Sequence, residues 1–302
     1  MSTRESTALV IDLTIPSRRL RVVFWFLSVL TPSLSMAQSY NKPESVEYHP
    51  RLNRHLVSST VGSSIQSRAA DGTITLFTAA PVAPYGIELL RGTLFVLDQG
   101  AVKGYDIDSA APVMSLPLTG AAFLNGITSN GVDTLYVSDF TNRRIYTVNV
   151  ANLAEPTQSA PLTITPQPNG LVFDPIDNRV LIGTWGASAR ILSMDPSGSL
   201  APTDLIQTSL ANIDGIALDC NGAIIVSAWS SCGATGGCLR RFDPPFALNS
   251  PAQFVANTLS SPADIDYSPY NATVGVPENS ANRVTLVPTT CEASIFGSDF
   301  EQ

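Results

Sequence analysis

The sequence has few of the side chains that most hydrolases and metal sites use. It contains only two histidines, His49 and His55, and no Cys-x-x-Cys spacing, which disfavours a zinc knuckle. It has no Gly-x-Ser-x-Gly element, which disfavours serine-histidine-aspartate chemistry. It has no run of basic residues and a formal net charge of −8, so we expect no nucleic acid partner. No stretch after residue 37 keeps a helical period, which argues against a helical fold.

The N-terminal segment, residues 1–37, has the layout of a secretory signal peptide. Residues 18–21 (RRLR) form a basic edge, residues 22–30 (VVFWFLSVL) an apolar run and residues 35–37 (SMA) a small-residue cleavage site. The apolar run is too short to span a bilayer. We therefore expect cleavage after residue 37 and export of residues 38–302 to the periplasm or the outside of the cell, with no stable membrane span. An uncleaved membrane anchor is the alternative.

The segment that remains after cleavage is strongly acidic. Residues 1–37 carry four arginines, one glutamate and one aspartate, so their removal changes the net charge from −8 to −10. An acidic protein is suited to holding hard cations, and it is a poor match for nucleic acid.

Four cysteines are present, Cys220, Cys232, Cys238 and Cys291. An even number in an exported chain favours disulfides. Cys232 and Cys238 bracket Gly-Ala-Thr-Gly-Gly between two strand-like runs, so a disulfide at a hairpin tip is the preferred pairing. This pairing leaves Cys220 with Cys291, although the sequence allows two other connectivities.

A repeat of 40 to 49 residues organises the rest of the chain. In its clearest copy, residues 170–174, 179–185 and 190–194 read as successive short antiparallel strands separated by turn residues. A period of this size indicates a propeller, and six copies account for residues 38–302. We predict an all-β, six-bladed β-propeller of four-stranded antiparallel meanders, as a single domain with a short C-terminal tail at 291–302.

The last copy is short of strands. A strand from elsewhere is therefore expected to complete the ring. Either the residues just after position 37 or residues 294–296 could supply it.

One position of the repeat opens the first strand of each copy. Oxygen-bearing side chains occupy it in four copies: Glu44, Asn125, Asn169 and Asp214. Tyr85 and Ala263 occupy it in two weaker copies. The first strand of a propeller blade runs along the central channel, so residues at one repeat position should converge on the axis.

Three of these side chains make a candidate metal site. Glu44, Asn169 and Asp214 would bring two carboxylates and one amide oxygen to one point, which suits Ca²⁺ or Mg²⁺. The competing interpretation is that Asn-Gly and Asp-Gly are ordinary turn pairs. Glu44 argues against it, because glutamate is not a turn former and is costly to bury without a partner.

The chain resembles the senescence marker protein/gluconolactonase (regucalcin-like) family of six-bladed propellers. The matching motifs are Pro-Glu-Ser-Val at 43–46, Pro-Asn-Gly-Leu at 168–171 and Asp-Gly-Ile-Ala at 214–217. The resemblance implies that Glu44, Asn169 and Asp214 hold one divalent cation. It also implies that Asn125, in Asn-Gly-Ile, lies near the metal and the substrate.

The chain departs from the family pattern in two places. Family lactonases usually carry a polar or basic residue before the middle-blade asparagine, where this chain has Ala122-Phe123-Leu124. Their first-blade motif usually reads Glu-Gly-Pro followed by an aromatic residue, where this chain has Glu44-Ser45-Val46. These departures make the expected mouth less polar than a sugar-acid site.

The resemblance implies a hydrolase of lactones or esters, with Asp214 as general base and Asn125 orienting the substrate. Ca²⁺ is the cation most expected, and Mg²⁺ or Zn²⁺ are alternatives. Tyr85 and Phe123 are predicted to contact the small-molecule substrate, so an apolar lactone or ester is as well supported as a sugar lactone. The alternative is a non-enzymatic binding or scaffold propeller with a structural or absent cation. A propeller lyase is disfavoured because Lys103 and the two histidines are poorly placed as bases.

Overall fold

The structure is a computed structural model that describes residues 14–15, 18–19 and 39–289. The chain divides into two units, Met1–Ala37 and Gln38–Gln302, and the boundary coincides with the predicted cleavage point. In the first unit the described residues form two short antiparallel strands, β1 (Thr14–Ile15) and β2 (Arg18–Arg19). The rest of the predicted signal peptide and the predicted tail lie outside the described residues, so cleavage stays a prediction. No helix of the described residues is long and apolar enough to cross a membrane.

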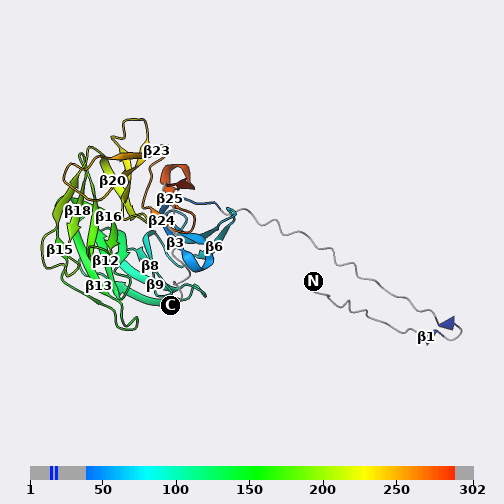
Figure 1. The fold of residues 1–302 in the computed structure, drawn as a ribbon. Helices are drawn as coiled ribbons and strands as arrows, with labels where there is room; N and C mark the ends of the chain where they lie inside the picture. The colour runs from blue at the N-terminus through cyan, green and yellow to red at the C-terminus, as the bar shows by residue number, and fades with distance from the viewer. Residues whose placement is uncertain (1–13, 16–17, 20–38, 290–302) are drawn as a thin grey trace. The chain divides into compact units, whose positions relative to one another are not determined.

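The second unit is a ring of six antiparallel sheets, which confirms the predicted six-bladed β-propeller (Figure 1). Blade 1 consists of β3 (Pro43–His49), β4 (Arg54–Ser59), β5 (Ser64–Ala69) and β6 (Ile74–Thr78), and blade 2 of β7 (Pro84–Leu90), β8 (Thr93–Asp98), β9 (Ala101–Asp106) and β10 (Pro112–Pro117). Blade 3 consists of β11 (Leu124–Ser129), β12 (Thr134–Asp139) and β13 (Arg144–Asn149), with β14 (Thr157–Gln158) and β15 (Leu162–Thr163) sharing its outer edge. Blade 4 consists of β16 (Gln167–Asp174), β17 (Arg179–Trp185), β18 (Arg190–Met194) and β19 (Thr203–Gln207), and blade 5 of β20 (Ala211–Leu218), β21 (Ile224–Ser230), β22 (Gly237–Phe242) and β23 (Gln253–Leu259). Blade 6 consists of β24 (Asp266–Ser268), β25 (Thr273–Glu278) and β26 (Arg283–Pro288), and two short 3-10 turns, η1 (Pro50–Leu52) and η2 (Asn279–Ala281), complete the elements.

The first strand of every blade lies innermost and contacts the first strands of both neighbouring blades. Strand β24 meets β3, where the Asp264 N–H donates to the Glu44 carbonyl at 2.9 Å, and this contact closes the ring. Within residues 39–289 blade 6 has three strands. Residues 39–42 form no strand, and residues 294–296, the other segment considered for closure, lie outside the described residues.

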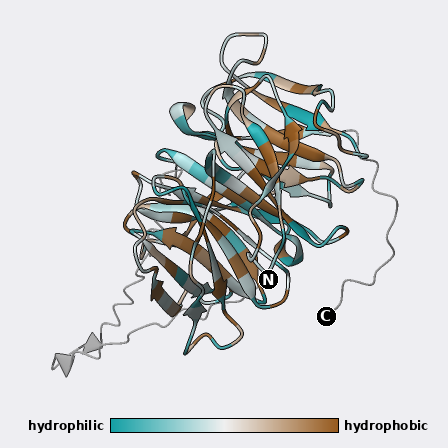
Figure 2. Ribbon diagram, turned by 90° about the vertical axis from the view of Figure 1, so that its left-hand side faces the viewer, coloured by the Kyte–Doolittle hydropathy of each residue, from teal (hydrophilic) through white to brown (hydrophobic). Residues whose placement is uncertain are grey.

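Apolar layers between adjacent blades hold the ring together. Strand β8 is buried along its whole length, because a middle strand is covered by a neighbouring blade on each face. Its Leu97 belongs to one cluster with Leu135 and Tyr146 of blade 3, and a similar cluster lies between blades 4 and 5. This double burial explains the dense β-branched and aromatic runs of the sequence. Figure 2 shows hydrophobic residues along the strands of the ring.

A disulfide joins Cys232 and Cys238 at the tip of the β21–β22 hairpin, as predicted, with Cα atoms 5.9 Å apart. Cys220 is also disulfide-bonded. Its predicted partner, Cys291, lies outside the described residues, so that pairing stays a prediction.

Candidate functional site

The Asn-Gly and Asp-Gly pairs lie inside the innermost strands, so the turn interpretation is wrong. At each of these pairs the pairing with the second strand shifts register. A Cβ atom on Gly126 would lie 2.4 Å from the Asn169 carbonyl oxygen, and one on Gly170 would lie 2.4 Å from the Asp214 carbonyl oxygen. Neither glycine has a positive φ. Glycine is therefore required by the close approach of neighbouring inner strands.

Serines of the second strands fix the spacing of these inner strands. Ser138 accepts the Gly126 N–H at 2.8 Å and donates to the Asn169 carbonyl of the next blade at 2.8 Å. Ser227 does the same with the Gly215 N–H and the Ala263 carbonyl. The backbone on both sides of the candidate ligands is thus held by buried hydrogen bonds, which presents the side chains toward the axis.

Asn169 and Asp214 meet as the repeat predicted. Asn169 Nδ2 donates to Asp214 Oδ1 at 3.2 Å and lies 3.4 Å from the Ile213 carbonyl oxygen. The Asn169 side chain is 1% exposed, and its Oδ1 is buried without any hydrogen-bond partner. Buried polar atoms of folded proteins nearly always have a partner, so a water molecule or a bound ligand would satisfy this oxygen.

Glu44 and Asp214 come from blades 1 and 5, and their charges act on each other. Burial raises the pKa of Glu44 to about 7, although Asn279 Nδ2, which donates to Glu44 Oε2 at 2.8 Å, acts in the opposite direction. Burial also raises the pKa of Asp214 well above its usual range, and the negative charges of Glu44 and Asp264 raise it further. Polar contacts with Trp229 and Asn169 lower it in part, although the Trp229 indole N–H forms no hydrogen bond of normal geometry.

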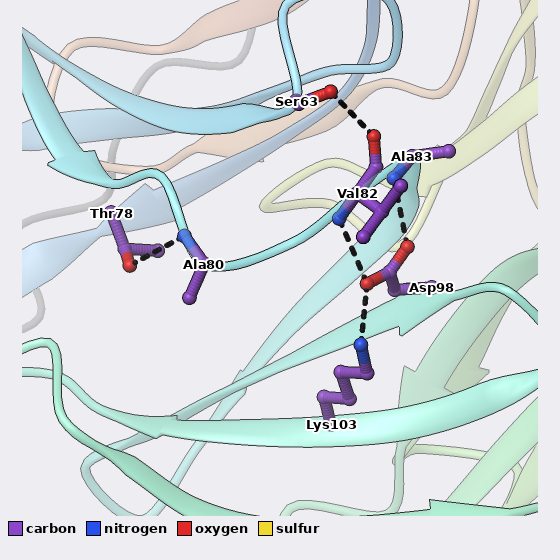
Figure 3. Close-up of polar contacts among 7 residues, drawn as sticks. All are labelled: Ser63, Thr78, Ala80, Val82, Ala83, Asp98 and Lys103. Carbon is purple, nitrogen blue, oxygen red and sulfur yellow. Dashed lines mark hydrogen bonds and ion pairs between the residues drawn. The ribbon is translucent and has the colours of Figure 1, made fainter.

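The contrast with Asp98 shows what these carboxylates lack. Asp98 accepts the backbone N–H groups of Val82 at 3.0 Å and Ala83 at 2.8 Å, and Lys103 Nζ lies 2.7 Å from its carboxylate (Figure 3). Burial alone would raise the pKa of Asp98, but these donors outweigh it and lower the pKa. Neither Glu44 nor Asp214 takes part in any ion pair among residues 39–289. Lys103 is therefore a structural partner of Asp98.

Of the predicted substrate residues, Tyr85 lies near Glu44 and Phe123 packs against Tyr85. Asn125 is 6% exposed on β11. Tyr85 and Phe123 are both half-buried, and their ring centroids are 4.8 Å apart in an edge-to-face contact. Burial raises the pKa of Tyr85, and the charge of Glu44 raises it further, which shows that the phenol lies near that carboxylate.

The sequence matches no protein-family model and no curated protein. Solved structures share the fold at low identity. A gluconolactonase from Xanthomonas campestris is 15% identical, with 79% of this chain and 83% of that chain covered and a TM-score of 0.59. A streptogramin B lyase is 14% identical, with 86% of each chain covered and a TM-score of 0.57, and hydrazine synthase from Kuenenia stuttgartiensis is 14% identical, with 85% and 79% covered and a TM-score of 0.62. These likenesses show the propeller fold that enzymes of different chemistry share.

A second group of axial carboxylates was missed in the sequence. Glu47, Glu88 and Asp266 each lie three residues after the first repeat position, on β3, β7 and β24. The charge of Asp266 raises the pKa of Glu88 although blade 1 lies between their blades, so these side chains converge on the axis. Asp264, on the approach to β24, carries a further charge that raises the pKa of Asp214, and the charge of Glu44 in turn raises the pKa of Asp264. The signal was in the repeat, because three of its six copies carry an acid three residues after the first repeat position.

The second group differs from the first in the donors that it accepts, which are backbone N–H groups of the neighbouring inner strand. Glu47 Oε1 accepts the Leu89 N–H of the next blade at 3.2 Å, and Asp266 Oδ2 accepts the Tyr48 N–H of the next blade at 2.7 Å. Thr128 accepts the Phe173 N–H in the same way at 3.1 Å. This recurring contact joins one inner strand to the next, so the second group is explained without a ligand.

A cation bound by Glu44, Asn169 and Asp214, the first group of axial residues, would have few protein ligands. No group of three or more His, Cys, Asp or Glu side chains among the described residues has a metal-binding arrangement. The donors available are the carboxylates of Glu44 and Asp214 and the free amide oxygen of Asn169. All are hard oxygen donors of the kind that Ca²⁺ and Mg²⁺ prefer. A separate half-open hollow of about 170 Å³ includes Leu90, at the opposite end of β7 from Tyr85, and lies apart from this site.

Proposed function

We propose that the chain is an exported hydrolase of lactones or esters that uses a divalent cation held by Glu44, Asn169 and Asp214. The observation that carries the proposal is the buried, unpartnered Oδ1 of Asn169, whose amide contacts Asp214, together with the charge of Glu44 that acts on Asp214. Neither carboxylate forms an ion pair among residues 39–289. An uncompensated buried charge is costly, and a bound cation would satisfy all three groups together.

The donor set fits a hard cation, and Ca²⁺ is the first choice. When bound, such an ion supplies a Lewis acid that polarises a carbonyl and lowers the pKa of water. Within the chain, Asp214 would accept the proton of the attacking water, because burial and the nearby carboxylates make it more basic than an ordinary aspartate. It would return the proton to the leaving oxygen as the ester C–O bond breaks. Asn125 would orient the substrate carbonyl.

Thermal unfolding tests the cation site. Ca²⁺ at 100 times its dissociation constant should stabilise the full chain by about 2.7 kcal/mol relative to EDTA, or roughly 5 °C. Asp214→Asn should lose this shift. Asp108→Asn is the matched control, because Asp108 is exposed in a surface ion pair with Arg51, and it should keep the shift. No shift in wild type, or an equal shift in Asp214→Asn, would rule the site out.

A panel of lactones and aryl esters tests turnover. Cation-dependent hydrolysis that is lost in both Asp214→Asn and Glu44→Gln supports the enzyme. Cation binding without hydrolysis of any member supports instead a binding or scaffold propeller whose cation is structural.

A further inference from the structure

The mouth of the propeller has a polar half and an aromatic half. In each blade the residue before the first repeat position pairs with a residue near the end of the second strand, for example Pro43 with Ser59 and Leu124 with Asp139. We call the residue that follows this partner the rim residue. In blade order the six rim residues are Thr60, Gln99, Phe140, Trp185, Trp229 and Asn279. Three consecutive blades, 3 to 5, thus carry an aromatic rim residue.

These aromatic residues form a continuous arc with two others. Tyr85 contacts Phe123, with centroids 4.8 Å apart, and Phe123 contacts Phe140 at 5.7 Å. Phe140 contacts Trp185 at 5.7 Å, and Trp185 contacts Trp229 at 5.2 Å. All four contacts are edge-to-face, with interplanar angles between 72° and 84°. We refer to these five residues as the aromatic arc.

Both ends of the aromatic arc reach the candidate site. Trp229 follows Ala228, which pairs with Ile213, the residue before Asp214. Tyr85 holds the first repeat position on β7, the inner strand that contacts the inner strand of Glu44. All five rings are only half-buried and they are contiguous, whereas exposed apolar side chains on a protein surface are normally scattered singly. Ligand sites typically combine such an apolar wall with a few polar groups that fix orientation. The arc and the carboxylates together have this composition.

We propose that the aromatic arc binds an alkyl chain attached to the lactone or ester group; this rests on the proposed function for the position of the polar head. The arc spans four blades, which is more than one aryl ring can cover, and its edge-to-face contacts offer no parallel pair of faces to enclose a flat ring. A sugar needs a hydrogen-bond partner for each hydroxyl, whereas the arc offers only one phenol and two indole N–H groups. A flexible alkyl chain can follow a curved apolar strip.

Tryptophan fluorescence can observe the arc directly. The chain has three tryptophans, and Trp185 and Trp229 are both in the arc. The third, Trp25, lies in the predicted signal peptide, so the full chain with Trp25→Phe reports on the arc alone. The probes are γ-lactams with alkyl side chains of two, six and ten carbons, because their ring amide resists hydrolysis and separates binding from turnover. Binding is measured in EDTA and in Ca²⁺.

Affinity should rise about threefold to fourfold for each methylene that the arc covers, so the six-carbon probe should bind on the order of 100-fold tighter than the two-carbon probe. Phe140→Ala, at the middle of the arc, should lose most of this gain, and Phe140→Leu should retain part of it. Phe254→Ala is the matched control, since Phe254 is 68% exposed on the outer strand β23, and it should keep the full gain.

Equal affinity for the three probes in the Trp25→Phe chain would overturn the proposal without any need for a further variant. The same chain-length gain in Phe140→Ala, with its fold checked by circular dichroism, would overturn it too. The chain-length gain together with no hydrolysis of any lactone would support the arc while refuting the hydrolase. Hydrolysis whose KM is independent of chain length would support the hydrolase and refute the arc as the site of the alkyl chain.

Discussion

Replacing Glu88 by glutamine is expected to stabilise the metal-free protein in alkaline solution. Burial raises the pKa of Glu88 from 4.5 to about 8, and the charge of Asp266 raises it as well, while hydrogen bonds from Ser129 lower it in part. The folded protein therefore keeps a proton that the unfolded chain releases above about pH 4.5. Stability from this group is complete below pH 4.5 and is lost as the pH rises toward 8. Glutamine keeps a carbonyl oxygen to accept the Ser129 hydrogen bonds but cannot ionise.

The size of the effect follows from the two pKa values. A shift from 4.5 to about 8 corresponds to about 4 kcal/mol of lost stability at pH 8 if the carboxylate were fully excluded from water. The Glu88 side chain keeps partial solvent contact along the axis, which screens its charge, so we take about half of that value. The variant should be more stable than wild type by about 2 kcal/mol at pH 8 and by a few tenths at pH 5.

Urea unfolding in EDTA at pH 5 and pH 8 measures this difference. In thermal unfolding at pH 8, the melting temperature of Glu88→Gln should be roughly 4 °C above that of wild type. Glu155→Gln is the matched control, because Glu155 is exposed in the loop after β13, and it should change stability by less than about 0.5 kcal/mol at both pH values. A Glu88→Gln effect that is equal at the two pH values, or a destabilisation at pH 8, would refute the idea that uncompensated charge on the axis limits stability.

Two further substitutions test the frame that holds the site. Asp98→Ala removes the acceptor of two backbone N–H groups and the partner of Lys103, so it should cost about 3 kcal/mol in urea unfolding; Asp108→Ala, which breaks an exposed ion pair, should cost less than about 0.5 kcal/mol. Gly126→Ala would place Cβ 2.4 Å from the Asn169 carbonyl oxygen and should cost about 3 kcal/mol or more. Gly131→Ala, in open space with a φ of 75°, should cost only about 1 kcal/mol. Equal costs within either pair would contradict the roles assigned here.

The fold could be predicted from the sequence because each blade repeats the same physical problem. A middle strand covered on both faces must be continuously apolar, as at residues 93–98, and turns between strands need Gly, Pro, Asn or Asp. Six such units in about 265 residues leave a closed ring as the arrangement that protects the strand edges. The completion of blade 6 could not be predicted, since a short edge strand has no pattern of its own.

The candidate site was only partly predictable. The repeat correctly brought Asn169 against Asp214, and the charge of Glu44 acts on Asp214, because equivalent positions on the inner strands must converge. It did not distinguish ligand-like acids from the acids that join blades, such as Glu47, because that difference depends on which backbone N–H lies opposite. The aromatic arc was only partly predicted: Tyr85 and Phe123 were assigned to the substrate, but its continuation was not, since Phe140 and Trp185 are neighbours only across a blade boundary.

The buried acids of this propeller are of two kinds, according to whether a basic side chain pairs with them. Asp98, Asp174 and Glu278 each pair with a basic residue five positions later, which is the reach of a hairpin, so a single blade neutralises its own charge. Within residues 39–289, Glu44 and Asp214 pair with no basic residue, and Asp214 faces the charges of other acids. Their charge can be balanced by a proton or by a cation from solution. Among the acids near the axis, Glu47 and Asp266 accept backbone N–H groups of the next blade, whereas Glu44 and Asp214 accept side-chain amide donors. This difference is why we place the proposed cation and reactive position at Glu44 and Asp214.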